Sequence, residues 1–246
     1  MKTIGIVCEG PTDQIVISHI VDMLTSEENK YFRLQPEETL AGRNGNGWKG
    51  VVKWCRDNWD DREMLMHQVQ PEIDFLIVHM DGDVSRKEKS AHCGCSSSIE
   101  CPIKGTTDPL NCDKTPEGRA MCPIQLPCSD HGAPIGGYME HLTHLINGGK
   151  TYQEDVCIVI PCDSIEAWIV AAFDKADDAE MIENPWENII SKKKSYHDIR
   201  VRGSSKNQRT FADLANVVCE NWTDVTQICE TARYFESDIR RLIAPI

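Results

Sequence analysis

Acidic side chains stand just after three apolar segments of this chain. Glu9 and Asp13 bound the turn Glu-Gly-Pro-Thr-Asp, which follows the first apolar segment. Asp81 and Asp83 form the turn Asp-Gly-Asp after the most apolar segment, and Glu166 follows a third one. Carboxylates that are packed together repel one another, so a buried group of them needs cations for neutralisation. Because oxygen-only ligands favour Mg²⁺ or Mn²⁺, which activate water in phosphoryl chemistry, these residue types predict a metal-dependent phosphoryl-transfer site.

The combination of these turns is more specific than any one of them. An Asp-x-Asp turn alone is typical of a solvated loop, and Glu9 alone would be an ordinary loop acid. The i to i+4 spacing from Glu9 brings Asp13 close to it if the following helix begins early, so that Asp13 can serve a second ion. Thr12 or Asp13 is also the expected cap of that helix.

Alternating strands and helices must position these side chains. Short segments rich in apolar and β-branched residues predict strands, and the segments between them have helical patterns. The predicted strands are 2–8, 31–35, 73–80 and 156–161, and the predicted helices are 13–25, 48–66, 134–147 and a segment from Asp163 to about 174. This alternation predicts a parallel α/β sheet flanked by helices, with all strands ending at one edge, where ligands bind. The acidic residues should therefore converge at that edge.

The chain divides into a core, an insertion and a C-terminal segment. We predict that residues 1–83 and 132–175 form the α/β core, and that residues 84–131, rich in Cys, Pro, Ser and Gly, interrupt it. Residues 176–246 are predicted to be helices joined by a basic loop. A length of 246 residues suffices for one good core with such an insertion.

The insertion concentrates residues that bind zinc. Six of the 12 cysteines lie in it, and we expect the other six in the core. A segment this polar cannot build a core, so one or two structural Zn²⁺ ions would supply its folding energy. An iron–sulfur cluster, free thiols and a disulfide-bonded loop are the alternatives, since the spacing contains no clean Cys-x-x-Cys pair. The predicted zinc ligands are His92, Cys93, Cys95, Cys101, Cys112, Cys122, Cys128 and His131.

A basic loop contrasts with the formal net charge of -13. Within eighteen positions, seven cationic residues are opposed only by Asp198. They predict contacts with the phosphates of a nucleic acid, and a solvated loop is the alternative. The seven residues are Lys192, Lys193, Lys194, Arg200, Arg202, Lys206 and Arg209.

Composition limits the class of protein further. The charge of -13 argues against a general polyanion binder, but not against a nuclease that concentrates acids around metal ions. The hydrophobic share of 40% is ordinary for a globular protein, and no apolar run approaches the roughly 18 to 20 residues of a membrane span. The first residues enter a strand pattern directly, so we expect no signal peptide, no membrane partner and a cytoplasmic location.

Three short motifs resemble those of TOPRIM proteins. Segment 4–13, IGIVCEGPTD, resembles the opening motif of the TOPRIM domain of primases, topoisomerases and nucleases of the overcoming-lysogenisation-defect (OLD) family. Segment 78–83, VHMDGD, resembles the DxD motif of that domain. Segment 163–168, DSIEAW, is similar to a Ser-x-Glu-x-Trp element in stand-alone RloB-like proteins of phage defence.

The resemblance implies a TOPRIM-like (Rossmann-like) fold and a role for each matched acid. It implies Glu9 as a metal ligand or general acid/base and Asp81 and Asp83 as ligands of Mg²⁺ or Mn²⁺. Asp13 and Glu166 are the implied candidates for a second ion. The Cys-rich insertion that follows the DxD motif departs from the family pattern.

The first functional hypothesis is a metal-dependent nuclease that cleaves DNA or RNA in anti-phage defence. The alternative is a non-catalytic sensor or effector module that works through a separately encoded ATPase. A topoisomerase or primase would need domains for which the chain has little room. A HAD-type phosphatase ranks lower, because that class places its DxD after the first strand, where this chain has Glu9.

Overall fold

The computed structural model describes residues 1–36, 47–84, 142–143, 146–147, 154–191, 195–201 and 206–244. The eight predicted zinc ligands, from His92 to His131, lie outside these residues, so the zinc site stays a prediction. Lys192 to Lys194 and Arg202 of the basic loop also lie outside them. Of the predicted helix 134–147, residues 142–143 and 146–147 are described, and they are helical.

In the described part of the chain, four strands form one sheet in the order β2-β1-β3-β4. All three strand pairings are parallel, which confirms the predicted parallel α/β class. The strands lie where the apolar segments predict them; β1, β3 and β4 are shorter than predicted by two or three residues, and β2 is longer by one. They are β1 (Thr3–Val7), β2 (Lys30–Gln35), β3 (Phe75–His79) and β4 (Val156–Val159).

The two central strands are buried on both faces. In β3, Phe75 and Ile77 belong to one hydrophobic cluster, while Leu76 and Val78 belong to a second cluster on the opposite face. Every residue of β3 is buried. Near-continuous apolar strands are expected when helices cover both faces of a parallel sheet, because neither face then meets water.

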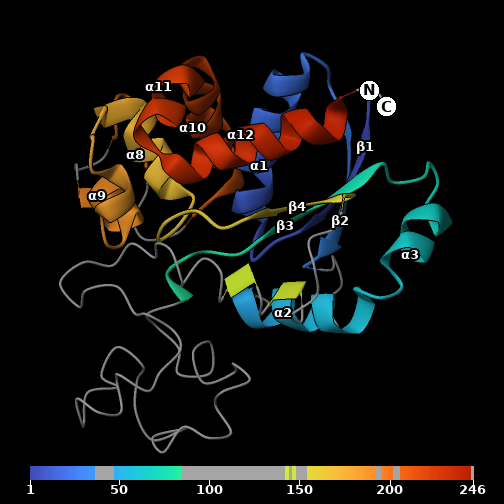
Figure 1. Cartoon of the computed structure of the whole chain (residues 1–246). Coiled ribbons are helices and arrows are strands. Elements are labelled where there is room, and N and C mark those ends of the chain that lie inside the picture. Colours follow the sequence, from blue (N-terminus) through green and yellow to red (C-terminus); the bar gives the residue numbers. More distant parts are fainter. Residues whose placement is uncertain are drawn as a thin grey trace, which may run out of the picture.

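Helices cover both faces of the sheet (Figure 1). One face is covered by a thick layer of helices, and the other by a thinner layer that Figure 1 shows below the strands. The thick layer contains α1 (Pro11–Thr25), α8 (Glu166–Asp174), the 3-10 turn η3 (Ala179–Met181), α9 (Pro185–Ser191), α10 (Gln208–Glu220), α11 (Trp222–Ile228) and α12 (Glu230–Ile243). The thinner layer includes α2 (Gly47–Asn58), α3 (Arg62–Gln68) and the helical residues Leu142 and Ile146, which pack in the same hydrophobic cluster as Val51 of α2.

The single helix predicted at 48–66 is therefore wrong, since the structure has two helices with a turn at residues 59–61. The turn follows Asp57 and Asn58 and contains Asp60 and Asp61. Such short polar side chains are poor helix formers, because they compete for nearby backbone groups. Asn58 shows this competition, since its Nδ2 donates a hydrogen bond to the carbonyl oxygen of Trp54 at 2.8 Å.

The C-terminal helices pack onto the α/β core. The Trp168 ring of α8 stacks against Phe235 of α12 with centroids 5.6 Å apart. Its indole nitrogen donates a hydrogen bond to Thr231 Oγ1 at 3.0 Å. Trp168 and Phe235 belong to the same hydrophobic cluster as Ile4 and Ile77 of the sheet. Residues 206–244 thus share a core with the strands, and no described helix is long and apolar enough to cross a membrane.

The cysteines outside the insertion also belong to this packed interior. Cys8, Cys55, Cys157, Cys162 and Cys229 are buried, as predicted for core cysteines, and Cys219 is half-buried. Burial raises the pKa of the Cys219 thiol to about 11, with help from the charges of Asp22 and Glu220. These side chains act as small apolar residues.

Gly5 in the central strand β1 tests the packing between strands and helices. A Cβ at this position would lie 2.5 Å from Leu76 Cδ2 and 2.9 Å from Leu34 Cδ1. We expect Gly5→Val to lower the free energy of unfolding by about 1 to 3 kcal/mol, because the side chains must leave their positions. Urea denaturation measures the loss. Asp57→Asn, on the exposed surface of α2, is the control and should unfold like the wild-type protein. Equal stability of Gly5→Val and wild type would contradict this packing.

Candidate active site

The acids that follow β1 and β3 meet at the carboxyl edge of the sheet. Glu9 lies two residues beyond β1, and Asp81 lies two residues beyond β3. The backbone N–H of Asp81 donates a hydrogen bond to Glu9 Oε1 at 2.8 Å. Because the strands are parallel neighbours, their ends bring these loops together although the residues are 72 positions apart.

The loop after β3 is also fastened to the loop after β4. The N–H of Gly82 donates to the carbonyl oxygen of Pro161 at 3.1 Å, and that of Asp83 donates to the carbonyl oxygen of Asp163 at 2.8 Å. Asp163 has a positive φ of 59°, a conformation that Asp tolerates better than most residues. Its Oδ2 accepts a hydrogen bond from the N–H of Asn184 at 3.0 Å. These bonds fix where Asp81 and Asp83 leave the sheet.

Glu9 is a carboxyl group whose surroundings favour the protonated form. Burial, with a smaller contribution from the charges of Asp13 and Asp83, raises its pKa to about 8 against the opposing effect of the backbone N–H groups of Asp81 and Trp48. Gly47 lies beside Glu9 with a φ of +70°, and a Cβ there would lie 3.7 Å from Glu9 Oε2. The N–H of Gly47 donates to the Glu9 carbonyl oxygen at 3.2 Å. Glycine suits this position because other residues rarely adopt that φ.

Asp13 lies near the start of α1 and is almost completely buried. The helix begins at Pro11 with Gly10 as its N-cap, so the prediction that Thr12 or Asp13 is the N-cap is wrong. Asp13 Oδ2 instead accepts a hydrogen bond from the N–H of Gly10 at 2.9 Å. Burial raises the pKa of Asp13 to about 7, as does the charge of Glu166, while Lys206 and the Gly10 N–H oppose the rise.

His79 is a site residue that the sequence reasoning missed. This last residue of β3 is fully buried, with Nε2 3.5 Å from Asp81 Oδ1 and Nδ1 3.9 Å from Asp13 Oδ2. Within the described residues, neither ring nitrogen has a hydrogen-bond partner, and neither does Asp81 Oδ1. Burial lowers the pKa of His79 to about 3, assisted by the charge of Lys206, so the ring is neutral. The available signal was a lone imidazole in an otherwise apolar strand.

Asp81 is the carboxyl group whose pKa is raised by burial and by all four of the other predicted acids. Its side chain is 16% exposed. Its pKa is raised well above the ordinary value, first by burial and then by the charges of Glu9, Asp13, Glu166 and Asp83. All five acids predicted from the sequence therefore lie close enough to interact.

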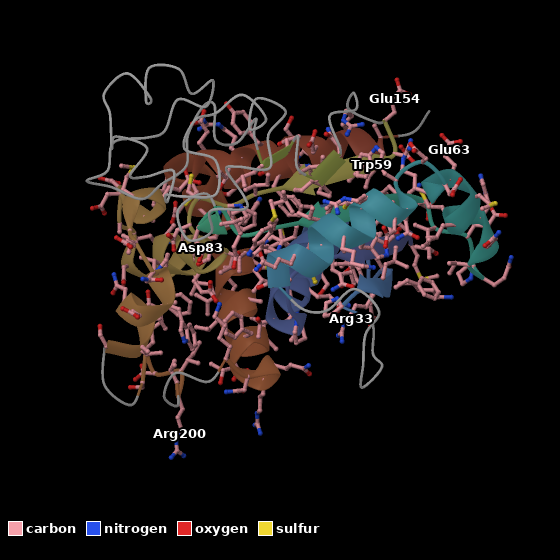
Figure 2. The ribbon with its side chains drawn as sticks, turned by 90° about the horizontal axis from the view of Figure 1, so that it is seen from below. Arg33, Trp59, Glu63, Asp83, Glu154 and Arg200 are labelled. Carbon is pink, nitrogen blue, oxygen red and sulfur yellow. The ribbon has the colours of Figure 1, made fainter. Side chains whose placement is uncertain are left out.

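Glu166 begins α8 and is fully buried. Its Oε1 lies 2.5 Å from the Nζ of Lys206, a residue predicted to belong to the basic loop. Burial works to lower the pKa of Lys206, but the carboxylates of Glu166 and Asp81 outweigh it and hold this pKa above its ordinary value. Lys206 therefore faces the acids, whereas Arg200 is exposed and projects outward in Figure 2.

The carboxylate oxygens at this edge of the sheet are the candidate ligands of a divalent ion. In the ranges that the structure describes, no three His, Cys, Asp or Glu side chains are grouped as a ready ligand set. Mg²⁺ does not require one, because it keeps several waters and is usually held by one or two carboxylates and a substrate phosphate. Asp81 Oδ1, buried without a hydrogen-bond partner in the described residues, and the adjacent Glu9 carboxylate fit that pattern.

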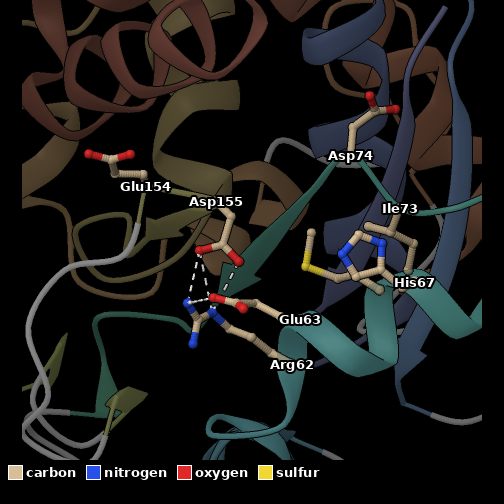
Figure 3. Close-up of a pocket in the computed structure, with 8 residues that line it drawn as sticks. Arg62, Glu63, His67, Ile73, Asp74, Glu154 and Asp155 are labelled. Carbon is tan, nitrogen blue, oxygen red and sulfur yellow. Dashed lines mark hydrogen bonds and ion pairs between the residues drawn. The ribbon is translucent and has the colours of Figure 1, made fainter.

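A separate cavity lies at the opposite, amino end of β3 and β4 (Figure 3). It has a volume of about 460 Å³ and is lined by residues that include Arg62, Asp74 and Asp155. The Arg62 guanidinium donates to both Asp155 oxygens, with Nε–Oδ2 and Nη2–Oδ1 distances of 3.1 Å, and to the Trp59 carbonyl oxygen. This ion pair fastens α3 to the segment that enters β4, far along the strands from the acidic site.

Comparisons with known proteins give no further support for the three TOPRIM-like motifs. No protein-family model, no curated protein and no solved structure matches the chain. The resemblance to TOPRIM proteins therefore depends on three short segments, and the candidate site is defined by the contacts among its side chains.

The raised pKa values predict that stability depends on pH in the absence of metal. Between the ordinary carboxyl pKa and the folded values of about 7 and 8, the native state binds more protons than the unfolded state. Stability is therefore present below that window and is lost as pH rises through it. We expect the free energy of unfolding to fall by at least about 1 kcal/mol between about pH 5 and pH 8.

Urea denaturation in chelator-treated buffer measures this change. Glu9→Gln should flatten the profile, because it removes one of the carboxyl groups with a raised pKa, whose combined effect exceeds the opposite contribution of His79. Asp57→Asn is the control, since Asp57 is an exposed partner of Lys53 at 2.9 Å. A rise in stability from pH 5 to pH 8 in the wild-type protein would contradict the assigned charge states.

Proposed function

We propose that this chain is a Mg²⁺-dependent phosphodiesterase that hydrolyses nucleic-acid backbones, with Glu9 and Asp81 as the residues that hold the ion. The contact between Glu9 Oε1 and the Asp81 N–H carries the proposal, because it joins the ends of the two central strands. It sets a carboxylate of one loop beside a carboxyl group of the other, and Asp81 Oδ1 there lacks a hydrogen-bond partner in the described residues.

The side chains supply binding and proton transfer. Hydrolysis adds water to phosphorus and breaks one P–O bond, so a proton must leave the water and another must reach the departing oxygen. A bound Mg²⁺ supplies Lewis acidity at the phosphate and lowers the pKa of water. Without metal, burial and neighbouring charges raise the pKa of Glu9 to about 8, so Glu9 gives up a proton near neutral pH when it becomes a ligand of the ion. Asp83 adds negative charge beside Glu9 and, under this proposal, a further ligand.

A nucleic-acid substrate is supported by the position of the remaining cations. Arg200 and Arg209 are exposed, and they lie on either side of Lys206 in the sequence. Lys206 itself contacts Glu166 of the acidic site. Exposed arginines position a phosphate backbone without reading its sequence. Because the whole chain has a net charge of -13, attraction of a polyanion must come from a local group of cations such as these arginines. The proposed role in anti-phage defence is based only on the resemblance to TOPRIM proteins.

The test compares wild type with Glu9→Gln and Asp81→Asn on plasmid DNA, single-stranded DNA and RNA. We expect Mg²⁺- or Mn²⁺-dependent cleavage of at least one substrate, and a loss of about 100-fold or more in each variant, because each removes a charge from the metal site. Asp57→Asn, on the exposed surface of α2, should cleave at the wild-type rate.

Two outcomes would contradict the proposal. Equal cleavage by all four proteins would show that the reaction occurs elsewhere. No cleavage of any substrate by a folded wild-type protein would favour the non-catalytic module that works through a separately encoded ATPase.

A further inference from the structure

Lys206 is the cation that the structure sets among the buried acids. Its Nζ lies 2.5 Å from Glu166 Oε1, and the Glu166 side chain is completely buried while that of Lys206 is 35% exposed. The unpartnered imidazole of His79 lies between Asp13 and Asp81 in the same cluster. The cluster therefore combines carboxyl groups, buried nitrogens without partners in the described residues, and one ammonium group.

We propose that the Lys206 ammonium takes the place of a second metal ion, so that the site binds one divalent ion, at Glu9 and Asp81, and uses Lys206 as a fixed cation for the substrate phosphate. This inference rests on the proposed function and specifies its metal stoichiometry. It also changes the expectation from the sequence, in which Asp13 and Glu166 are the ligands of a second ion.

Each of those carboxylates already has one oxygen in contact with a nitrogen of the chain, although Glu166 Oε2 is buried without a hydrogen-bond partner in the described residues. Asp13 Oδ2 accepts the Gly10 N–H at 2.9 Å, so it caps the positive end of α1. Glu166 Oε1 lies against the ammonium of Lys206. A divalent ion placed between them would lie beside a positive charge in a poorly solvated site, where repulsion between charges is strong.

Lys206 is held in this position by a helix and by aromatic rings. It immediately precedes Asn207, the N-cap of α10, whose Oδ1 accepts a hydrogen bond from the Thr210 N–H at 2.9 Å. Its Nζ lies 6.0 Å from the ring centroids of both Trp186 and Phe211, within the range of cation–π attraction. The start of a packed helix therefore determines where this charge stands.

The charge of Lys206 acts on every member of the predicted second-ion set. It counteracts the rise in the pKa of Asp13. It is itself stabilised by Glu166, Asp81 and Asp13, which together hold its pKa above the ordinary value against the effect of burial. An ammonium that interacts with three carboxyl groups does the neutralising that a second ion would otherwise do.

The test counts Mn²⁺ ions on the full chain by electron paramagnetic resonance of free Mn²⁺ at about pH 7.5. We expect one ion per chain for wild type and for Lys206→Arg, which keeps the positive charge. Lys206→Met removes the charge at similar length, and we expect it to bind a second ion through Asp13 and Glu166. Lys175→Met, which breaks an exposed ion pair with Asp224, is the control and should bind one.

Each result distinguishes this inference from the proposed function. Two ions on wild type would overturn the inference and leave a metal-dependent enzyme intact. No ion on folded wild type would overturn the proposed function itself. If folded Lys206→Met still binds one ion, then Lys206 is not what excludes a second ion, and the inference fails. If Lys206→Met does not fold, the number of ions on the wild-type protein decides the stoichiometry.

Discussion

The parallel sheet forces like charges together, and the rest of the site follows from this constraint. Glu9 leaves β1 and Asp81 leaves β3 at the same edge, where the N–H of one loop binds the carboxylate of the other at 2.8 Å. The pKa of Asp81 is raised by burial and by four other carboxyl groups. Such a cluster is costly in a folded protein unless protons or cations neutralise it.

Each carboxyl group is neutralised in its own way. The amino end of α1 stabilises Asp13, and Lys206 stabilises Glu166. Glu9 and Asp81 form no ion pair with a lysine or an arginine in the described residues, so their raised pKa values favour protons until a stronger cation binds. Asp13 and Glu166 are therefore held by contacts within the chain, whereas Glu9 and Asp81 are the pair that would hold an ion.

Periodicity was sufficient to predict the sheet and the place of the acids, but not the direction of individual side chains. Strands made of apolar and β-branched residues can be located from the sequence, and parallel pairing then fixes which turns share an edge. The inward direction of Lys206 depends on where α10 begins and on its packing, so a lysine in a basic loop gives no local sign of it. His79 was missed for the same reason, because a strand pattern does not show which acids flank an imidazole. The helix break at residues 59–61 depends on short-range competition among polar side chains, which an apolar pattern does not report.

The central claim is that Glu9 and Asp81 exchange protons for a divalent ion. Isothermal titration calorimetry of Mg²⁺ binding at about pH 7, repeated in buffers of different ionisation enthalpy, measures the protons released per ion. We predict the release of at least about one proton per ion, because both carboxyl groups have raised pKa values and must deprotonate when they bind a metal. Binding without proton release, or no binding, would contradict it.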